Sequence, residues 1–361
     1  MTAPPGLPLR PELLGVEPYG APELEVAVRL NVNENPYPPP HQFAADLQAA
    51  VADVAARLNR YPDREAGVLR DALASYLGLG LTKERVWPAN GSNEVMLQVM
   101  QAFGGPGRSA LSFTPTYSMY PEYARNTSTR WLTAPRGPEF EIERHLAVAA
   151  VQEARPDVVV LASPNNPTGS MVGLDVVKAV CEVAPGVVVV DEAYAEFRRS
   201  GVPSALSLLD DYPHLAVTRT MSKAFSLAGI RLGYLAGSTP FVDALRLVRL
   251  PYHLSALTQA AAAVALAHAQ ELLGSVDALR AERDATVGWL RAHHLRVADS
   301  DANFVLFGIF EDRRAVWQGL LDREVLIRET GPSGWLRVSI GTPEEMSAFK
   351  AALIDVLEGE G

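Results

Sequence analysis

Short, continuously apolar runs alternate with helix-like segments between residues 86 and 240. Two clear examples are PDVVVLA at 156–162 and GVVVV at 186–190. Neither run alternates polar with apolar residues, so each is typical of a strand that is covered on both faces. The pattern predicts an α/β fold with a mostly parallel central sheet and helices on both faces. The ligand of such a sheet is expected at the carboxyl ends of its strands.

The flanking sequence predicts two further parts. Residues 1–40 are rich in proline and end in NVNENPYPPP, which excludes helix and central strand and predicts an arm. Residues 41–245 form the predicted large domain. Residues 246–361 continue a long helical stretch, which runs from 239 to 294, and then alternate strands with helices. This last part is predicted to be a smaller α+β domain that packs with the arm.

Net charge and cysteine content limit the binding partners and the cellular compartment that we expect for this chain. The chain has 42 acidic and 32 basic residues, a formal net charge of −10, which argues against a general surface for nucleic acid or anionic membrane. The N-terminus lacks the pattern of a signal peptide, and no apolar run approaches the ~18 residues of a membrane span. The single cysteine, Cys181, is expected to be a small buried side chain in a reducing compartment. We expect a cytoplasmic protein.

Polar residues follow three successive apolar runs, in SPNNPTG, DEAY and TRTMSK. Singly, each could be a turn or a helix cap, but parallel strands bring their carboxyl ends to one edge of a sheet. Asp191, after four valines, would be desolvated and would need a cationic or hydrogen-bonding partner. Lys223, partly buried, would have a lowered pKa, and Arg231 would offer a planar donor fork to an anion. Together they predict a pocket for a phosphorylated carbonyl compound.

Competing motifs are weaker. VVVVDE resembles the acidic strand of a nucleotide hydrolase, but none of the four lysines follows a glycine, as a phosphate loop requires. GGPGRSA matches a dinucleotide fingerprint, but it precedes a strand instead of following one. The seven histidines form no HExxH or cysteine-paired set, so we expect no metal site.

The motifs NNPTG at 165–169, DEAY at 191–194 and SKAF with GIRLGY at 222–234 resemble the fold-type-I pyridoxal-phosphate aminotransferases. The resemblance extends over nearly the whole chain. Within that family it is nearest to the histidinol-phosphate aminotransferases, on LNVNENP, RYPD, GSNE, TPTYSMY and IRETGPSGWLRVSIGT. Two departures are the YPPP that follows NENP and Asn93 in place of the more usual aspartate.

The resemblance implies a set of catalytic and cofactor-binding residues for pyridoxal 5'-phosphate. Lys223 would attach the cofactor covalently and then move a proton, and Asp191 would pair with the pyridine nitrogen. Tyr194 and Asn166 would bond to the phenolic oxygen, and Tyr117 would stack on the ring. The implied phosphate-binding residues are Ser92, Asn93, Thr220, Ser222 and Arg231, with Tyr61 contributed by a neighbouring subunit of a homodimer with shared active sites.

The resemblance also implies the substrates, which are histidinol phosphate and the pair glutamate and 2-oxoglutarate, in histidine biosynthesis. The products would be imidazole acetol phosphate and glutamate. Arg337 would bind the α-carboxylate of one substrate and the phosphate of the other, because an arginine fork can serve either anion. Arg328, Tyr19 and Asn166 would assist it.

Three other functions are compatible with parts of this pattern. An aromatic amino acid aminotransferase shares every cofactor residue. A decarboxylase of a phosphorylated amino acid would release carbon dioxide and need no 2-oxoglutarate. A ligand-sensing domain of a transcription regulator would need a DNA-binding extension, whereas this sequence begins with the proline-rich arm.

Overall fold

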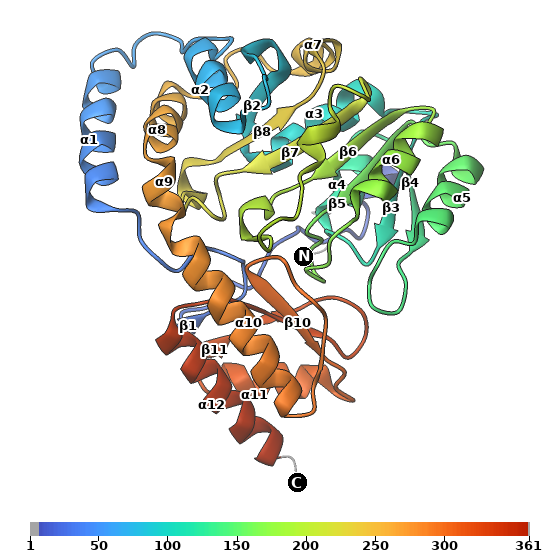
Figure 1. Cartoon of the computed structure of the whole chain (residues 1–361), viewed down its shortest axis with the longest axis vertical. Helices are drawn as coiled ribbons and strands as arrows, with labels where there is room; N and C mark the ends of the chain where they lie inside the picture. Colours follow the sequence, from blue (N-terminus) through green and yellow to red (C-terminus); the bar gives the residue numbers. More distant parts are fainter. Residues whose placement is uncertain (1–6, 360–361) are drawn as a thin grey trace.

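The computed structural model describes residues 7–359, which form a larger and a smaller body (Figure 1). Residues 1–6 of the predicted arm and 360–361 of the predicted small domain lie outside this range. The larger body contains a seven-stranded sheet. In spatial order its strands are β2 (Val86–Asn90), β8 (Leu232–Ala236), β7 (Leu215–Thr220), β6 (Val187–Asp191), β5 (Val158–Ala162), β3 (Ser109–Thr114) and β4 (Arg130–Pro135).

The sheet is mostly parallel, as the apolar runs predict. Strand β8 runs antiparallel to β2 and β7, and the other neighbouring strands are parallel. Consecutive residues of β5 pack into two different cores, with Val159 and Leu161 in one and Val158 and Val160 in the other. The first core includes α5 (Arg144–Ala154) and α6 (Leu174–Val183), and the second includes α3 (Gly91–Phe103), α4 (Met119–Asn126) and α7 (Thr239–Val248). The continuous apolar strands thus have helices on both faces.

The prediction of one long helix between residues 239 and 294 is wrong, because the structure has several shorter helices there. After α7 the chain forms α8 (Ala256–Ala267), α9 (Ala269–Leu272) and α10 (Val276–Ala292). Pro251 interrupts the pattern after α7 because it has no N–H to donate. Ser255 then caps α8, since its hydroxyl oxygen accepts a bond of 3.0 Å from the amide of Thr258.

Helix α8 packs against α1 (His41–Ala55) and α2 (Gly67–Leu77), at the left of Figure 1. The predicted division into residues 1–40, 41–245 and 246–361 stays a prediction. Within that division, α8 belongs to the third segment by sequence and contacts the second.

The smaller body contains an antiparallel sheet of four strands, in the order β12-β13-β10-β9. Their bounds are β12 (Arg328–Glu329), β13 (Leu336–Ser339), β10 (Phe304–Gly308) and β9 (Arg296–Val297). Helices α10, α11 (Arg313–Leu321) and α12 (Pro343–Gly359) pack into the same core. The described 3₁₀ turns are η1 (Pro11–Leu13), η2 (Lys83–Arg85), η3 (Ala195–Phe197), η4 (Ala205–Leu208), η5 (Ala228–Ile230) and η6 (Leu273–Ser275).

The arm contacts the smaller body through a short parallel strand pair. Strand β1 (Val28–Arg29) pairs with β11 (Val325–Leu326). The amide of Ser339 also donates to the carbonyl oxygen of Leu30 at 2.9 Å. Residues 31–33 follow directly, so these contacts position that part of the arm beside the carboxyl edge of the large sheet.

No helix among residues 7–359 is long and apolar enough to cross a membrane. Cys181, on α6, is a free, buried cysteine, as predicted. Burial raises the pKa of its thiol to about 12, so the side chain stays neutral and behaves as a small apolar group.

Candidate active site

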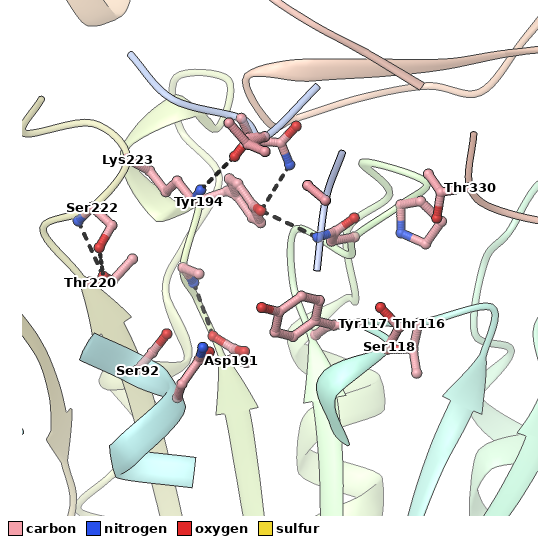
Figure 2. Close-up of a pocket in the computed structure, with 18 of the residues that line it drawn as sticks. Ser92, Thr116, Tyr117, Ser118, Asp191, Tyr194, Thr220, Ser222, Lys223 and Thr330 are labelled. Atoms are coloured by element: carbon pink, nitrogen blue, oxygen red, sulfur yellow. Dashed lines mark hydrogen bonds between the residues drawn. The ribbon is translucent and has the colours of Figure 1, made fainter. Parts of the chain in front are cut away.

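A cavity of about 260 Å³ lies at the carboxyl edge of the large sheet, between the two bodies (Figure 2). The structure brings every predicted site residue except Tyr61 into its lining. These residues are Tyr19, Ser92, Asn93, Tyr117, Asn166, Asp191, Tyr194, Thr220, Ser222, Lys223, Arg231, Arg328 and Arg337. Asn31, Val32 and Asn33 of the arm also line it.

Lys223 lies in the turn that follows β7 and points into the cavity (Figure 2). Its ammonium nitrogen Nζ donates to the carbonyl oxygen of Val32 at 3.0 Å. Burial, together with the nearby positive charges of Arg337 and Arg231, lowers the pKa of Lys223 to about 8, although Glu34 acts in the opposite direction. A substantial neutral fraction is therefore present at mildly alkaline pH, as a lysine nucleophile requires.

Asp191 ends strand β6 and is buried, with 6% of its surface exposed. The Tyr120 hydroxyl donates to Oδ2 at 2.7 Å. Oδ1 accepts from the Thr218 hydroxyl at 3.1 Å and from the Ala193 amide at 3.2 Å. No described residue forms an ion pair with this carboxylate, and burial raises its pKa. A cation in the cavity would restore its ionised form.

Sequence reasoning missed Tyr120 and Thr218. A signal was available for Tyr120, which follows Tyr117 by three residues and so could share a helix face with it. None was available for Thr218, because threonine is an ordinary residue inside a strand.

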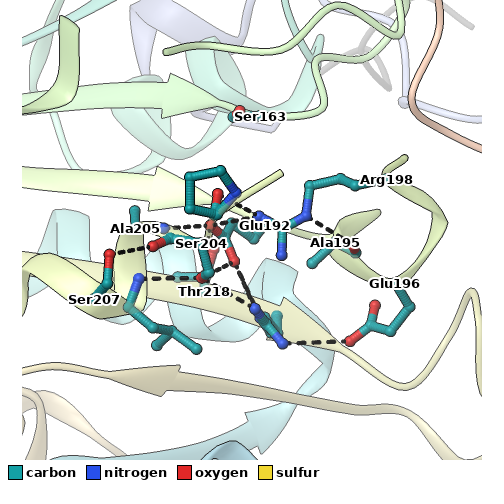
Figure 3. A network of polar contacts seen from close by, with 12 residues as sticks. Ser163, Glu192, Ala195, Glu196, Arg198, Ser204, Ala205, Ser207 and Thr218 are labelled. Atoms are coloured by element: carbon teal, nitrogen blue, oxygen red, sulfur yellow. Dashed lines mark hydrogen bonds and ion pairs between the residues drawn. The ribbon is translucent and has the colours of Figure 1, made fainter. Parts of the chain in front are cut away.

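The neighbouring residue Glu192 has the opposite environment (Figure 3). Its carboxylate accepts from Arg219 at 2.8 Å, from the Ser204 hydroxyl at 2.7 Å and from the Ala205 amide at 2.9 Å. Arg219 and Ser204 donate to Oε2, whereas Ala205 donates to Oε1 and Arg198 lies 3.4 Å from that same oxygen. Both arginines are largely buried, so this group is a compensated ion cluster, which we call the Glu192 cluster.

An anion cradle lies between the first turn of α3 and the start of β8. A Cβ built on Gly91 would meet Arg231 Nη2 at 2.7 Å, and one on Gly233 would meet the Ser92 amide nitrogen at 2.1 Å. Glycine at both positions is therefore required for this close approach. The first-turn N–H groups of α3 have no partner within the helix, and Arg231 adds a positive charge beside them, which together favour an anion.

Hydroxyl groups extend this cradle. Arg231 Nη1 donates to Ser222 Oγ at 3.3 Å, and Thr220 Oγ1 lies 3.1 Å from the same oxygen. Asn93 Oδ1 accepts from the Tyr123 hydroxyl at 2.8 Å. An aspartate could accept the same bond, so the departure at Asn93 preserves this contact.

Two arginines on the smaller body face the opposite side of the cavity. Arg337 donates to Asn166 Oδ1 at 2.6 Å and to the carbonyl oxygen of Asn31 at 2.9 Å, and its buried Nε has no described partner. Arg328 donates to the carbonyl oxygen of Gly20 at 3.1 Å, and its buried Nη1 also has no described partner. Both arginines line the cavity, where their guanidinium groups suit an anionic ligand.

Tyr61 lies away from the cavity, with 79% of its surface exposed, and stacks on Tyr252 at a centroid separation of 4.4 Å. Its predicted role depends on a second subunit and stays a prediction.

Comparison with known proteins identifies the family of this chain. The model of the family "Aminotransferase class I and II" matches residues 25–353. The chain belongs to this family. The histidinol-phosphate aminotransferase of Thermobifida fusca is 62% identical to this aminotransferase over 348 residues, which cover 96% of this chain and 95% of the relative. Histidinol-phosphate aminotransferase 3 of Burkholderia lata is 58% identical, with 97% and 96% covered.

A solved structure supports the same relationship. The histidinol-phosphate aminotransferase of Sinorhizobium meliloti, in complex with pyridoxal-5'-phosphate, matches this aminotransferase with a TM-score of 0.85 and 26% identity. The match covers 93% of this chain and 92% of that one. The predicted resemblance and the predicted fold-type-I architecture are both confirmed.

Proposed function

We propose that the chain is a histidinol-phosphate aminotransferase that uses pyridoxal 5'-phosphate. It transfers the amino group of histidinol phosphate to 2-oxoglutarate and produces imidazole acetol phosphate and glutamate. The observation that carries the choice of substrate is the pair Arg337 and Arg328, each with a buried, unpaired donor on the side of the cavity opposite the anion cradle. The names of the close relatives agree with it.

The residues in the cavity fit this cofactor at both of its charged ends. The Asp191 carboxylate has neutral donors and no resident cation, which suits a protonated pyridine nitrogen. The cradle beside Gly91, which a side chain would fill, suits the phosphate. We assign the phosphate to the amides of Ser92 and Asn93 and to Thr220, Ser222 and Arg231.

The ring would lie between these two sites. Tyr117 would stack on its face, and Tyr194 and Asn166 would hydrogen-bond to its phenolic oxygen. When bound, the cofactor supplies an electron sink for the pair that remains after Cα loses its proton.

Lys223 has two tasks in this proposal. Its neutral amine would hold the cofactor covalently. The same amine, once free, would accept and donate the proton at the substrate Cα. A pKa of about 8 leaves the amine able to accept and to donate a proton near neutral pH.

Arg337 binds both substrates in turn. It receives the α-carboxylate of glutamate or 2-oxoglutarate and the phosphate of histidinol phosphate, since its planar fork suits either anion. Arg328, Tyr19 and Asn166 assist it. Tyr19 lies at the mouth of the cavity, where its hydroxyl accepts from Ser118 at 3.3 Å.

A homodimer with shared sites, located in the cytoplasm, completes the proposal. Exposed apolar side chains occur near α1, α2 and the end of α7, and they offer a surface for a second copy. They are Leu58, Tyr61, Val68, Leu247, Leu250 and Tyr252. Tyr61 would reach the phosphate cradle of the partner copy.

A spectroscopic experiment tests the substrate. Purified protein loaded with pyridoxal 5'-phosphate is mixed with histidinol phosphate, and the visible band of the bound cofactor is followed. We expect the band to convert to that of the pyridoxamine form and to return on addition of 2-oxoglutarate. An unchanged spectrum would refute the assignment.

Variants separate this function from its alternatives. Arg328→Ala should reduce turnover of histidinol phosphate by about 10²-fold, because a charge-assisted bond to the phosphate is lost. Arg323→Ala, at an exposed position just after the C-terminus of α11, is the matched control. Efficient turnover of phenylalanine would favour an aromatic aminotransferase, and release of carbon dioxide without 2-oxoglutarate would favour a decarboxylase.

A further inference from the structure

Asn33 belongs to the arm and lines the cavity, although only 2% of its surface is exposed. Its backbone is left-handed, with φ of 57°, a conformation that asparagine adopts more readily than most residues. Glycine would also adopt this backbone, but it would have no side chain. The amide group of Asn33 is therefore the feature that needs an explanation.

Ser339, at the end of β13, determines which way this amide points. The backbone N–H of Asn33 donates to Ser339 Oγ at 2.9 Å. The Ser339 hydroxyl in turn donates its only proton to Asn33 Oδ1 at 2.8 Å. Since Oδ1 is engaged as an acceptor, Nδ2 must point the other way. It donates to the Tyr194 hydroxyl at 3.0 Å.

A second side-chain amide also donates a hydrogen bond to the Tyr194 hydroxyl. Asn166 Oδ1 accepts from Arg337, and this contact directs Nδ2 of Asn166 to the Tyr194 oxygen at 3.4 Å. Figure 2 shows both contacts as dashed lines that meet at the Tyr194 hydroxyl.

Two amide donors occupy the two lone pairs of the Tyr194 oxygen. No described residue accepts the hydroxyl proton of Tyr194, and the ring itself is fixed by an edge contact with Phe304 at 5.1 Å. The only remaining freedom is rotation about the C–O bond. The proton is therefore directed into the cavity.

We propose that Asn33 and Ser339 are positioning residues that force Tyr194 to act as a hydrogen-bond donor in the cavity. The inference rests on the proposed role of Tyr194 beside the phenolic oxygen of the cofactor. A donated bond stabilises the anionic form of that oxygen, so it lowers the pH at which the visible band of the bound cofactor changes. The Asn33 side chain thus tunes the chemistry through Tyr194, without contacting the Lys223 amine itself.

The test is a pH titration of the visible band in full-length, cofactor-loaded protein with no substrate present. The result is therefore independent of which substrate the enzyme uses. Asn33→Asp keeps the shape of the side chain but replaces the donor with an acceptor, so the Tyr194 proton should turn away from the cavity. We expect the midpoint to rise by about one pH unit, toward the value of Tyr194→Phe.

Two further variants isolate the cause. Ser339→Ala should raise the midpoint by a smaller amount, because the Asn33 amide is then free to flip. Asn35→Asp makes the same chemical change two residues away, where the side chain donates to Ala224 and Ser275 instead, and should leave the midpoint unchanged.

A double variant decides between orientation and added charge. In a Tyr194→Phe background, Asn33→Asp should cause no additional shift, because the hydroxyl through which it acts is absent. A shift that persists in this background would overturn the proposal, as would an Asn33→Asp midpoint equal to that of the wild type. Thermal unfolding of the cofactor-free variants checks that each one folds.

Discussion

Asp191 and Glu192 are adjacent, buried carboxylates at the end of β6, and their surroundings differ completely. Asp191 faces the cavity and accepts only from neutral donors. Glu192 faces away from it and is paired with Arg219 and Arg198. A buried charge that is paired within the chain needs nothing further, whereas one without a resident counter-charge implies a ligand.

The same contrast extends to the cations of the two regions. Arg219 of the Glu192 cluster bonds to carboxylates, and their charge raises its pKa. In the cavity, Lys223 donates only to a carbonyl oxygen, that of Val32, and Arg337 donates only to the carbonyl oxygen of Asn31 and the amide oxygen of Asn166. Charges in the cluster stabilise the fold, and charges in the cavity are available for chemistry.

The largest expected effect is the loss of turnover in Lys223→Ala. Without the amine, the proton transfer at Cα has no base, and we expect the rate to fall by about 10⁴-fold. The cofactor-free variant should unfold at a temperature no lower than the wild type. Lys178→Ala removes an exposed lysine on α6 and should retain full activity. Substantial activity in Lys223→Ala would contradict the proposed mechanism.

The second largest effects are expected when the neighbouring carboxylates Asp191 and Glu192 are replaced separately and compared. Asp191→Asn should lower turnover by about 10³-fold, because the counter-charge of the cofactor nitrogen is lost. Its stability should change by no more than about 1 kcal/mol, since the Tyr120 hydroxyl can accept as well as donate.

Glu192→Gln should show the reverse pattern. It removes the shorter of the two carboxylate contacts of Arg219, leaves only Glu196 at 3.6 Å, and should lower the free energy of unfolding by about 3–5 kcal/mol. Turnover per folded molecule should stay near the wild-type value. Urea unfolding and active-site titration measure the two quantities. If Asp191→Asn and Glu192→Gln lost activity and stability to the same extent, the proposed difference between the cavity and the Glu192 cluster would be wrong.

The pH dependence of stability tests the unpaired lysine. In the unfolded chain Lys223 has its ordinary pKa of 10.5, and burial lowers it to about 8 in the folded state. Between these values the folded state has released a proton that the unfolded state retains, so the stability of the wild type rises with pH. Below pH 8 both states are protonated, and the buried ammonium destabilises the fold.

Lys223→Met should therefore be more stable than the wild type at pH 7. The difference between the two free energies of unfolding should shrink by about 3 kcal/mol between pH 7 and pH 10.5. The comparison uses cofactor-free proteins, with Lys178→Met as the exposed control. A difference that does not vary with pH would show that the pKa of Lys223 is unperturbed.

The smallest effect concerns the neutral donors around Asp191. Tyr120→Phe removes the bond to Oδ2, which raises the pKa of Asp191 and should lower turnover by about tenfold, or about 1.4 kcal/mol. Tyr234→Phe removes a buried hydroxyl that has no described partner, so it should be neutral or slightly stabilising. Similar losses in both variants would assign the effect of Tyr120 to packing alone.

The sequence was sufficient to predict the sheet and the residues at its edge because both depend on local patterns. Four valines followed by Asp191 predict a strand that is covered on both faces and ends in a polar group. Thr218 and Asn33 could not be predicted in the same way. Thr218 differs from any other strand threonine only through its bond to Asp191, and Asn33 depends on Ser339, 306 residues later in the chain.

Helix α8 shows a related limit. Its alanine-rich sequence predicts a helix correctly, but small side chains on every face give no direction for packing. Its contacts with α1 and α2 come from tertiary structure, whereas the break between α7 and α8 is already marked in the sequence by Pro251.

The contacts of the arm also have a consequence for the order in which the chain folds during its synthesis on the ribosome. The large sheet, with Asp191 and Lys223 at its edge, has all its strands once Ala236 has emerged. The arm is synthesised first, yet Val28 has no strand partner until Val325 is made, and Asn33 waits longer still for Ser339. Nascent chains fold domain by domain. The side of the cavity formed by the large sheet, which contains Asp191, therefore forms early. The contact between Asn33 and Ser339, which orients Tyr194, forms last.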